Sequence, residues 1–404
     1  MTSQVMESGV SMQSAPYSPG LEGVIAAQTA ISSVDGQNGE FIIRGFSIED
    51  FASHATFEDT VYLLWHDALP VAEAFNRFSG ELAALRTLEP HTLELLRAAA
   101  ARRLHAMDAL RMACASLSGA AGSVAAARES AAARLEAMRL VAAVPVIVAA
   151  YHRLSRGLEP VAPREDLPHT ANFLYMLHGS EATGAVIRAL DTYWNTVSDH
   201  GLNASTFTAR VIVSTGSDVI SAVTGAVGAL KGPLHGGAPG PALDLVFAIG
   251  RADRAEEVLR QKLARGERLM GFGHRVYRTR DPRADVLGAA AEHLFERAGN
   301  RRVYDLARAV EACALRLLQE YKPERSLQTN VEFYTALLLH GIGFPTSLFT
   351  PVFAAGRVAG WTAHCLEQIA SNRLFRPQSQ YIGARNRRTI PAADCDRDSQ
   401  QVSE

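Results

Sequence analysis

The stretch VYDLARAVEACALRL, residues 303–317, carries apolar side chains at intervals of three and four residues. These side chains are Val303, Leu306, Val310, Cys313 and Leu317. The spacing matches the repeat of an α-helix and places them on one face, while charged residues occupy the other faces. Pro323 marks the expected end of this helix. Helical patterning of this kind dominates the chain, so the sequence predicts a mainly α protein.

Two further regions refine this expectation. Residues 72–151 are rich in Ala, Leu and Arg and poor in Gly and Pro, which predicts several close-packed helices. Their most apolar part, residues 140–151, is shorter than the ~20 residues that span a bilayer, so we expect a buried core helix and no membrane partner. One β-hairpin is predicted, because residues 30–34 and 40–44 are rich in β-branched and aromatic side chains and flank a turn with two Gly-containing pairs.

Length and composition restrict the possible domain organisation and partners. The 404 residues exceed the size at which one core stops growing, so we expect one large and one smaller domain. Forty basic residues face forty-two acidic ones, and no basic block interleaves with aromatics, which argues against nucleic acid as a partner. Residues 1–18 and 391–404 are polar and are expected to be disordered tails.

The cysteines and the N-terminal stretch indicate the setting. The four cysteines are far apart and lack the spacing of zinc ligands, so we expect reduced thiols and no metal site. The first basic residue is Arg44, which does not fit the positive start of a secretory signal or an Arg-rich presequence. We therefore expect a cytoplasmic protein.

Three histidines lie next to glycine, where a ligand can approach the backbone closely. They are His200 in SDHGLNASTF, His235 in KGPLHGGAPG and His274 in MGFGHRVYRTRDPR. Singly, each would more often be a hydrogen-bonded turn residue, but three such settings within residues 200–274 favour a shared site. The residues after His235 predict a helix start, whose dipole disfavours imidazolium. A neutral His235 would then be able to donate a hydrogen bond to a developing enolate oxygen.

Several ionisable residues point to an anionic ligand. Four arginines follow His274 within nine residues, namely Arg275, Arg278, Arg280 and Arg283. A solvated surface would explain one or two of them, whereas a multiply anionic ligand would explain all four, since guanidinium groups pair bidentately with carboxylates and phosphates. Glu332 and Arg357 lie in the mostly apolar residues 330–364, where each is either paired within the fold or free for a ligand. Position alone favours the paired state.

These motifs, taken together, resemble the citrate synthase family, which includes the 2-methylcitrate synthases. The opening hairpin is followed in family order by four motifs: DHGLNASTFTARV at 199–211, GPLHGG at 232–237, GFGHRVYRTRDPR at 271–283 and NVEFY at 330–334. The resemblance covers nearly the whole chain, and five ordered motifs are far more specific than any one of them.

The resemblance implies a mainly α, citrate synthase-like architecture. A large helical domain would comprise residues 19–236 and 336–390, and a smaller helical domain would comprise residues 237–335. The active site would lie in the cleft between the two domains. Closure of the small domain would exclude water and protect a thioester from hydrolysis.

The resemblance also implies catalytic roles. His235 matches the histidine that hydrogen-bonds the thioester oxygen and stabilises the enol. His274 matches the one that polarises the keto group of oxaloacetate and protonates the new alkoxide. Glu332 occupies the position of the carboxylate that removes the methyl proton. A thioester α-proton is only weakly acidic, so the base depends on stabilisation of the enolate as it forms.

Binding roles follow by the same matching. The residues that correspond to oxaloacetate ligands are His200, Arg283, Arg357 and Arg376, with Asn203 and Ser205 in the Asn-x-Ser after His200. Arg376 is expected to come from the partner subunit of a homodimer. Those that correspond to CoA ligands are Leu269, Met270, Gly271 and Arg278. CoA thioester and oxaloacetate are thus the expected small-molecule partners, with no cofactor.

Two positions depart from the family pattern. Glu332 replaces the usual Asp and is longer by one methylene, and Pro239 replaces the usual Asn after the His235 motif. A displaced helix start at Pro239 would accommodate the longer base. The leading expectation is condensation of acetyl-CoA with oxaloacetate to citrate and CoA. The alternatives are a 2-methylcitrate synthase that uses propionyl-CoA, because one methyl group is worth only ~1–3 kcal/mol of discrimination, and a weakly active or regulatory relative.

Overall fold

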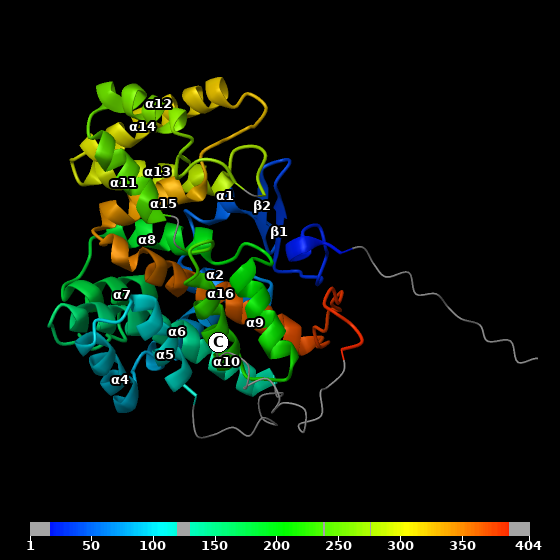
Figure 1. The fold of residues 1–404 in the computed structure, drawn as a ribbon. Coiled ribbons are helices and arrows are strands. Elements are labelled where there is room, and N and C mark those ends of the chain that lie inside the picture. Colours follow the sequence, from blue (N-terminus) through cyan, green and yellow to red (C-terminus); the bar gives the residue numbers. More distant parts are fainter. Residues whose placement is uncertain (1–16, 119–129, 237–238, 275, 388–404) are drawn as a thin grey trace, which may run out of the picture. The chain divides into compact units, whose positions relative to one another are not determined.

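The computed structural model describes residues 17–118, 130–236, 239–274 and 276–387, except for the side chains at 130 and 239. Residues 29–375 form one compact unit, and the described residues up to Gln28 and from Arg376 onward belong to a second. Helices predominate and the strands form one small sheet, so the mainly α class is confirmed (Figure 1). Apart from residues 17–18, the expected tails lie outside the described residues.

The predicted hairpin is present near the start of the first unit. Strand β1 (Ser32–Asp35) pairs antiparallel with β2 (Glu40–Ile43), and a short β3 (Phe46–Ser47), which the sequence did not indicate, extends the sheet in the order β1-β2-β3. Gly36 lies at the turn, and a Cβ there would be 2.2 Å from the carbonyl oxygen of Val276. The hairpin tip is therefore in direct contact with the loop that carries His274.

The helices account for most of the remaining described chain (Figure 1). Those of the first half are α1 (Ile48–Phe51), α2 (Phe57–His66), α3 (Ala72–Ala84), α4 (Pro90–Ala101), α5 (Ala106–Ser116), α6 (Ser130–Ser155), α7 (His169–His178) and α8 (Gly184–Val197). Those of the second half are α9 (Ala204–Ser214), α10 (Val219–Leu230), α11 (Pro239–Ile249), α12 (Ala255–Ala264), α13 (Pro282–Arg297), α14 (Arg302–Tyr321), α15 (Val331–Ile342) and α16 (Phe349–Ala370). Short 3-10 turns are η1 (Pro19–Leu21), η3 (Ala252–Arg254) and η4 (Thr346–Leu348).

Two helices predicted from periodicity are confirmed. Residues 303–317 lie in α14, which ends two residues before Pro323. Residues 140–151 lie in α6 and are all buried, as expected for a core helix. Their Pro145 stands inside the helix.

Helix α16 is the core of the unit. All residues from 349 to 365 except Thr350 and Phe353 are buried, and α16 packs against α2, α5, α6, α8, α9 and α10. Two glycines allow the close approach of α8 and the segment after it. A Cβ at Gly356 would lie 2.7 Å from the Trp194 ring, and one at Gly360 would lie 2.1 Å from the carbonyl oxygen of Ser198. Helix α16 thus lies directly against the segment that leads into His200.

Helices α11 to α14 gather at one end of the first unit in Figure 1. Helix α13 packs on α15 and α8, α11 packs on α15, and α12 packs on α14. These helices fall within the predicted small domain, 237–335, whose far boundary lies inside α15. The division into two domains that close on each other stays a prediction.

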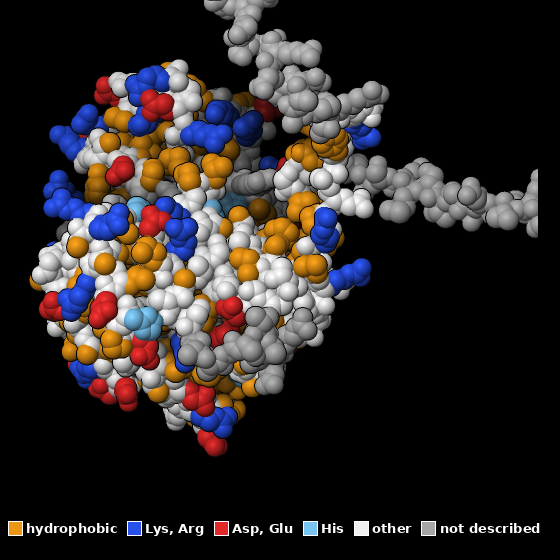
Figure 2. Space-filling model, turned by 60° about the horizontal axis from the view of Figure 1, so that its bottom comes forward, with side chains coloured by type: hydrophobic (Ala, Val, Ile, Leu, Met, Phe, Trp, Pro, Cys, Tyr) orange, Lys and Arg blue, Asp and Glu red, His pale blue; other side chains and the backbone are white. Residues whose placement is uncertain are grey.

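The surface and the helix lengths bear on the expected partners. On the face drawn in Figure 2, Lys and Arg side chains are interspersed with Asp, Glu and hydrophobic ones. Within the described ranges, no single helix is long and apolar enough to cross a membrane. The pair Val331–Ile342 and Thr346–Ala370, bent by 116°, meets the same test by length and composition alone.

Candidate active site

Six of the residues singled out in the sequence come from six different segments of the first unit. His200 lies between α8 and α9, His235 between α10 and α11, and His274 between α12 and α13. The other three lie on helices, with Arg283 in the first turn of α13, Glu332 in the first turn of α15 and Arg357 in the middle of α16. The rings of His200 and His274 are 5.9 Å apart, and Nη2 of Arg283 is 3.4 Å from Nε2 of His274. The fold therefore gathers the predicted site from three loops and three helices.

The proton of His274 has a defined position. The backbone N–H groups of Val276 and Tyr277 donate to Nδ1 at 3.0 and 3.1 Å, so this nitrogen carries a lone pair and the proton is on Nε2. Burial, and then the charge of Arg283, lower the pKa of His274 to about 4. The ring is neutral at pH 7. Because Nε2 and the guanidinium of Arg283 are both donors, an oxygen of a bound ligand is the partner that would satisfy both.

Glycine shapes the loop that carries His274. Gly271 and Gly273 have φ values of +91° and +82°, and a Cβ at Gly271 would lie 2.9 Å from the Phe333 ring. The Gly271 carbonyl accepts from the backbone N–H of Asn330 at 3.0 Å, and the Gly273 N–H donates to the carbonyl of Gln328 at 2.7 Å. The loop is thus paired with the segment that enters α15, which places His274 near Glu332.

Asp281, which sequence reasoning did not single out, joins these parts. It is buried, caps α13, and binds the side chain of Arg283 through contacts of 3.0 and 2.8 Å. It also accepts from the backbone N–H of Val331 at the start of α15 at 3.2 Å. Burial lowers the pKa of Arg283, but the paired Asp281, together with Tyr277 and Glu332, outweighs this and raises it. The Asp-Pro pair at a helix start was a signal that predicts such a cap.

Glu332 lacks the ion-pair partner that its position in an apolar segment led us to expect. Its Oε2 atom is buried and has no hydrogen-bond partner among the described residues, and it makes no ion pair there. Burial raises the pKa of Glu332, with Arg283 opposing and Asp281 assisting the rise. The expectation of a structural ion pair is therefore wrong for this residue. An unpaired carboxylate oxygen with a raised pKa is suited to accept a proton from a ligand.

Arg357 likewise has no carboxylate partner among the described residues. It is buried, its Nε donates to the carbonyl of Val197, and its guanidinium lies over the Phe353 ring at 4.7 Å. Burial lowers the pKa of Arg357 to about 10, with Asp199 opposing, so the group stays charged at pH 7. The expectation of a structural ion pair is wrong here too. A buried cation without a carboxylate partner is suited to bind an anionic ligand.

His200 and His235 are neutral as well. Burial, and then Arg283 and Arg357, hold the pKa of His200 well below its usual range, and its Nε2 lies 3.2 Å from the Tyr277 hydroxyl. Burial, and then Arg357, lower the pKa of His235 to about 4. Three neutral rings therefore surround the two buried arginines.

The proton of His235 depends on Ser205. Nε2 of His235 is 2.8 Å from Oγ of Ser205, which also accepts from the Trp361 indole N–H at 3.0 Å. The single hydroxyl proton has two acceptors, His235 and Oδ1 of Asn203 at 2.8 Å. When the proton goes to His235, the ring carries its own proton on Nδ1, which is then available as a donor. The predicted helix after His235 is α11, which begins at Pro239, while residues 237–238 lie outside the described part.

The remaining predicted residues have mixed placements. Leu269 is buried, Met270 is partly exposed and Gly271 is buried at the turn described above. Arg278 has an exposed side chain, and its backbone N–H donates to the carbonyl of Gly36 at 2.7 Å. Arg280 pairs with Asp285 and Glu311, so it is a structural residue.

Two further arginines from the sequence analysis are not placed at this site. Arg275 lies outside the described residues. Arg376 belongs to the second unit, where its exposed side chain donates to the carbonyl of Pro377 at 3.1 Å. Its role across a dimer stays a prediction.

Comparison with known proteins identifies the family of the chain. A family model described as citrate synthase, C-terminal domain, matches residues 20–378. The citrate synthase of Haloferax volcanii is 43% identical over 373 residues, covering 91% of this chain and 96% of its own. The 2-methylcitrate synthase of Mycobacterium tuberculosis is 40% identical over 369 residues, covering 91% of each.

Solved structures give the same result. The citrate synthase of Pyrobaculum aerophilum matches with a TM-score of 0.86 and 37% identity, over 97% of this chain and 99% of its own. The ternary complex of carboxymethyl coenzyme A and oxaloacetate with citrate synthase from Thermoplasma acidophilum matches with a TM-score of 0.83 and 29% identity, over 94% and 99%. Fold and site define a mainly helical protein with neutral histidines and unpaired charges at one centre. The chain belongs to the citrate synthase family.

Proposed function

We propose that this chain condenses acetyl-CoA with oxaloacetate to give citrate and CoA. The observation that carries the proposal is Glu332, in the first turn of α15: the residue is half-buried, but its Oε2 atom is fully buried and has no hydrogen-bond partner among the described residues. Burial raises the pKa of Glu332, and the charge of Arg283 opposes the rise. A base of this kind costs stability and contributes nothing to the fold. Its surroundings are those of an enolising site.

Oxaloacetate is the ligand that the two arginines support. Arg283 and Arg357 are both buried and charged, and they are close enough for the charge of Arg283 to lower the pKa of Arg357. Two carboxylates on one substrate would relieve this repulsion. The Nε2–H of His274 would then donate to the keto oxygen, which draws electron density from the carbon to be attacked.

The acyl-CoA is activated by a carboxylate and a histidine acting together. Glu332 takes a proton from the methyl carbon, and Nδ1–H of His235 donates to the thioester oxygen as it gains charge, provided that Ser205 donates to Nε2. The enol carbon attacks the keto carbon, and the alkoxide takes the proton of His274. The proton that Glu332 removed then returns to His274 through water, so that both groups are restored. Water then cleaves the thioester, so one acetyl-CoA, one oxaloacetate and one water give citrate and CoA.

There is a second candidate for the acyl-CoA substrate. The relative from Mycobacterium tuberculosis is named 2-methylcitrate synthase and is 40% identical. Propionyl-CoA would enter the same chemistry with one more methyl group. The ratio of kcat/KM for the two thioesters decides between them, and a ratio above one for propionyl-CoA would replace acetyl-CoA in the proposal.

A thiol-release assay tests the proposal. Wild-type protein with oxaloacetate and either thioester is expected to release CoA, and release should cease when oxaloacetate is omitted. Oxaloacetate binding without CoA release at any pH from 6 to 9 would instead support the weakly active or regulatory alternative.

We also propose that the protein works in the cytoplasm as a homodimer in which each site receives Arg376 from the second copy, and that residues 237–335 close over the large domain. Complementation tests the exchange of Arg376. Arg376→Ala and Glu332→Gln are each expected to be nearly inactive, whereas co-expression gives mixed dimers with one intact site and restores up to about a quarter of the activity, if each exchange affects only one site. Without recovery in the mixture, Arg376 acts within its own chain or not at all.

A further inference from the structure

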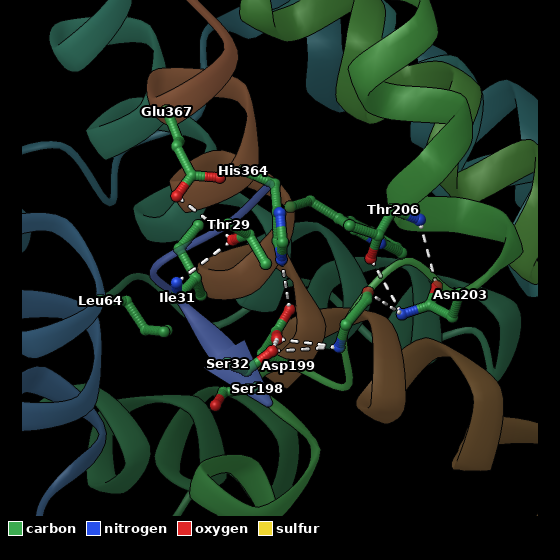
Figure 3. A network of polar contacts seen from close by, with 12 residues as sticks. Thr29, Ile31, Ser32, Leu64, Ser198, Asp199, Asn203, Thr206, His364 and Glu367 are labelled. Carbon is green, nitrogen blue, oxygen red and sulfur yellow. Dashed lines mark hydrogen bonds and ion pairs between the residues drawn. The ribbon is translucent and has the colours of Figure 1, made fainter. Parts of the chain in front are cut away.

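A buried carboxylate next to His200 holds the turn that carries this histidine. Asp199 is fully buried, and its Oδ1 accepts from Nε2 of His364 at 3.0 Å. Its Oδ2 accepts from the hydroxyl of Ser32 on β1 and from the backbone N–H of Gly201 at 3.0 Å (Figure 3). Asp199 and Gly201 are the two neighbours of His200. One carboxylate therefore fixes the backbone on both sides of that histidine.

The direction of the hydrogen bond from His364 is fixed by Arg210. Nη1 of Arg210, on α9, is 2.8 Å from Nδ1 of His364, and both side chains are buried. A guanidinium has donors only, so Nδ1 carries no proton. The one ring proton is on Nε2 and is donated to Asp199. His364 is thus a neutral bridge between a buried cation and a buried anion.

The contacts from Asp199 through His364 to Arg210 form a series, which continues through Glu367 to the segment that precedes β1. Arg210 pairs with Oε2 of Glu367 at 2.6 Å, and Oε1 of Glu367 accepts from the Ala30 N–H at 2.9 Å and the Thr29 hydroxyl at 3.2 Å (Figure 3). Both ends of the series therefore lie within residues 29–32. The contacts tie α9, α16 and β1 to the turn of His200.

Helix α16 carries both His364 and Arg357. They are seven residues apart, which is two helical turns, so they lie on one face of the helix. Between them is Gly360, where a Cβ would lie 2.1 Å from the Ser198 carbonyl oxygen and 2.9 Å from Oδ1 of Asp199. The backbone of α16 thus touches the same turn that His364 holds through its side chain.

We propose that His364 is a positioning residue of the oxaloacetate site: through Asp199 it fixes His200 relative to Arg357 and so sets the affinity for oxaloacetate. The inference rests on the proposed function. His364 does not touch the reacting atoms. Its ring could gain or lose a proton only by breaking the contact with Arg210 or the one with Asp199, so we assign it no role in proton transfer.

Two substitutions at 364 test the proposal. His364→Leu removes the donor to Asp199 and the acceptor for Arg210, so the KM for oxaloacetate is expected to rise about tenfold or more, as for a small misplacement of a binding group. The KM for acetyl-CoA should stay within about twofold, since the contacts of the thioester lie elsewhere. His364→Gln is expected to restore the KM for oxaloacetate to within about threefold of wild type, because an amide offers both an acceptor and a donor.

Cys365→Ala is the matched control. Cys365 is the next residue of α16, is equally buried, and shares no hydrogen bond or ion pair with Asp199, His364 or Glu367 among the described residues. Both KM values are expected to stay at the wild-type level in this variant, even if its Tm falls. Should His364→Leu fail to fold, Ser32→Ala removes one donor to the Asp199 carboxylate and a second acceptor for the Gly201 N–H. It is expected to raise the KM for oxaloacetate about threefold or more, since the turn of His200 loses these two contacts.

The outcomes separate the two claims. Wild-type protein that releases no CoA in the presence of oxaloacetate overturns the proposed function itself. Active wild type together with an unchanged KM for oxaloacetate in His364→Leu or Ser32→Ala overturns only the role of His364. The same holds for an equal rise in both KM values or for a Gln variant as impaired as the Leu variant, because a merely structural role predicts those results.

Discussion

Glu311 and Glu332 are two carboxylates in the same part of the molecule with opposite surroundings. Glu311, on α14, accepts hydrogen bonds from Arg280, Arg308, Thr329 and Tyr334, at 3.3, 2.6, 2.6 and 2.6 Å. Two of these donors, Thr329 and Tyr334, flank Glu332 in the sequence, and yet Oε2 of Glu332 has no partner among the described residues. The buried cations Arg210 and Arg357 differ in the same way: Arg210 pairs with Glu367, whereas Arg357 has no carboxylate partner in the part of the chain that the structure describes. In these two comparisons, the charge with partners stabilises the fold, whereas the charge without an ionic partner lies at the candidate site.

The largest effect is expected for the carboxylate pair. Glu332→Gln should lower kcat about 1,000-fold, because a general base contributes ~10²–10⁴, while the urea midpoint stays equal or rises. Glu311→Gln should instead destabilise the fold by about 2–4 kcal/mol, since four donors lose a charged acceptor. CoA release measures kcat, and urea unfolding measures the stability of each variant. A Glu332→Gln protein that keeps its turnover would remove Glu332 as the base.

The arginine pair gives the next largest contrast. Arg357→Met should raise the KM for oxaloacetate about 100-fold, as expected for the loss of a charge-assisted bidentate contact, without a fall in the urea midpoint. Arg210→Met should lower stability by about 3 kcal/mol, because it leaves Glu367 without its buried partner. If Arg357→Met unfolds more readily than Arg210→Met, the distinction between functional and structural cations fails.

A smaller effect is expected from the length of the base. Glu332→Asp shortens the side chain by one methylene. It should lower turnover about 10–100-fold if, as we expect, the helix start at Pro239 and the longer carboxylate shifted together. Steady-state kcat with acetyl-CoA measures this. A higher turnover in the Asp variant would show that Glu332 and Pro239 did not shift together.

The smallest effect concerns acid stability. The unfolded chain binds a proton at each histidine near pH 6.5, whereas burial lowers the pKa of His235 and of His274 to about 4 in the fold. The stability from these neutral rings is complete above pH 6.5 and is lost as the pH falls toward 4. His274→Gln should therefore lose less stability than wild type between pH 6.5 and 4.5 in urea titrations. Parallel loss in the two proteins would show that His274 is not buried in its neutral form.

Much of this picture was readable from the sequence. The repeat of apolar residues gave α14, and the paired turn signals gave β1 and β2. The order of the motifs led to His200, His235, His274 and Glu332, which the fold does bring into one unit. Local patterns carry this information because helix and turn preferences depend on neighbouring residues.

The partnerships of the charged residues were not readable. Arg280 and Arg283 are three residues apart in one motif, but Arg280 pairs with Asp285 and Glu311 while Arg283 pairs with Asp281 beside the site. The pairing of Asp199 with His364 spans 165 residues. Such contacts depend on how α16 lies against the turn after α8, which no local pattern specifies.

Formation of a new carbon–carbon bond is the most direct test, since CoA release alone would also follow from thioester hydrolysis. Wild-type protein would be incubated with oxaloacetate and acetyl-CoA labelled with carbon-13 at the methyl group, and the products followed by NMR. The account predicts labelled citrate in equal amount to the CoA released, and neither product in excess. Labelled acetate with no labelled citrate would contradict it.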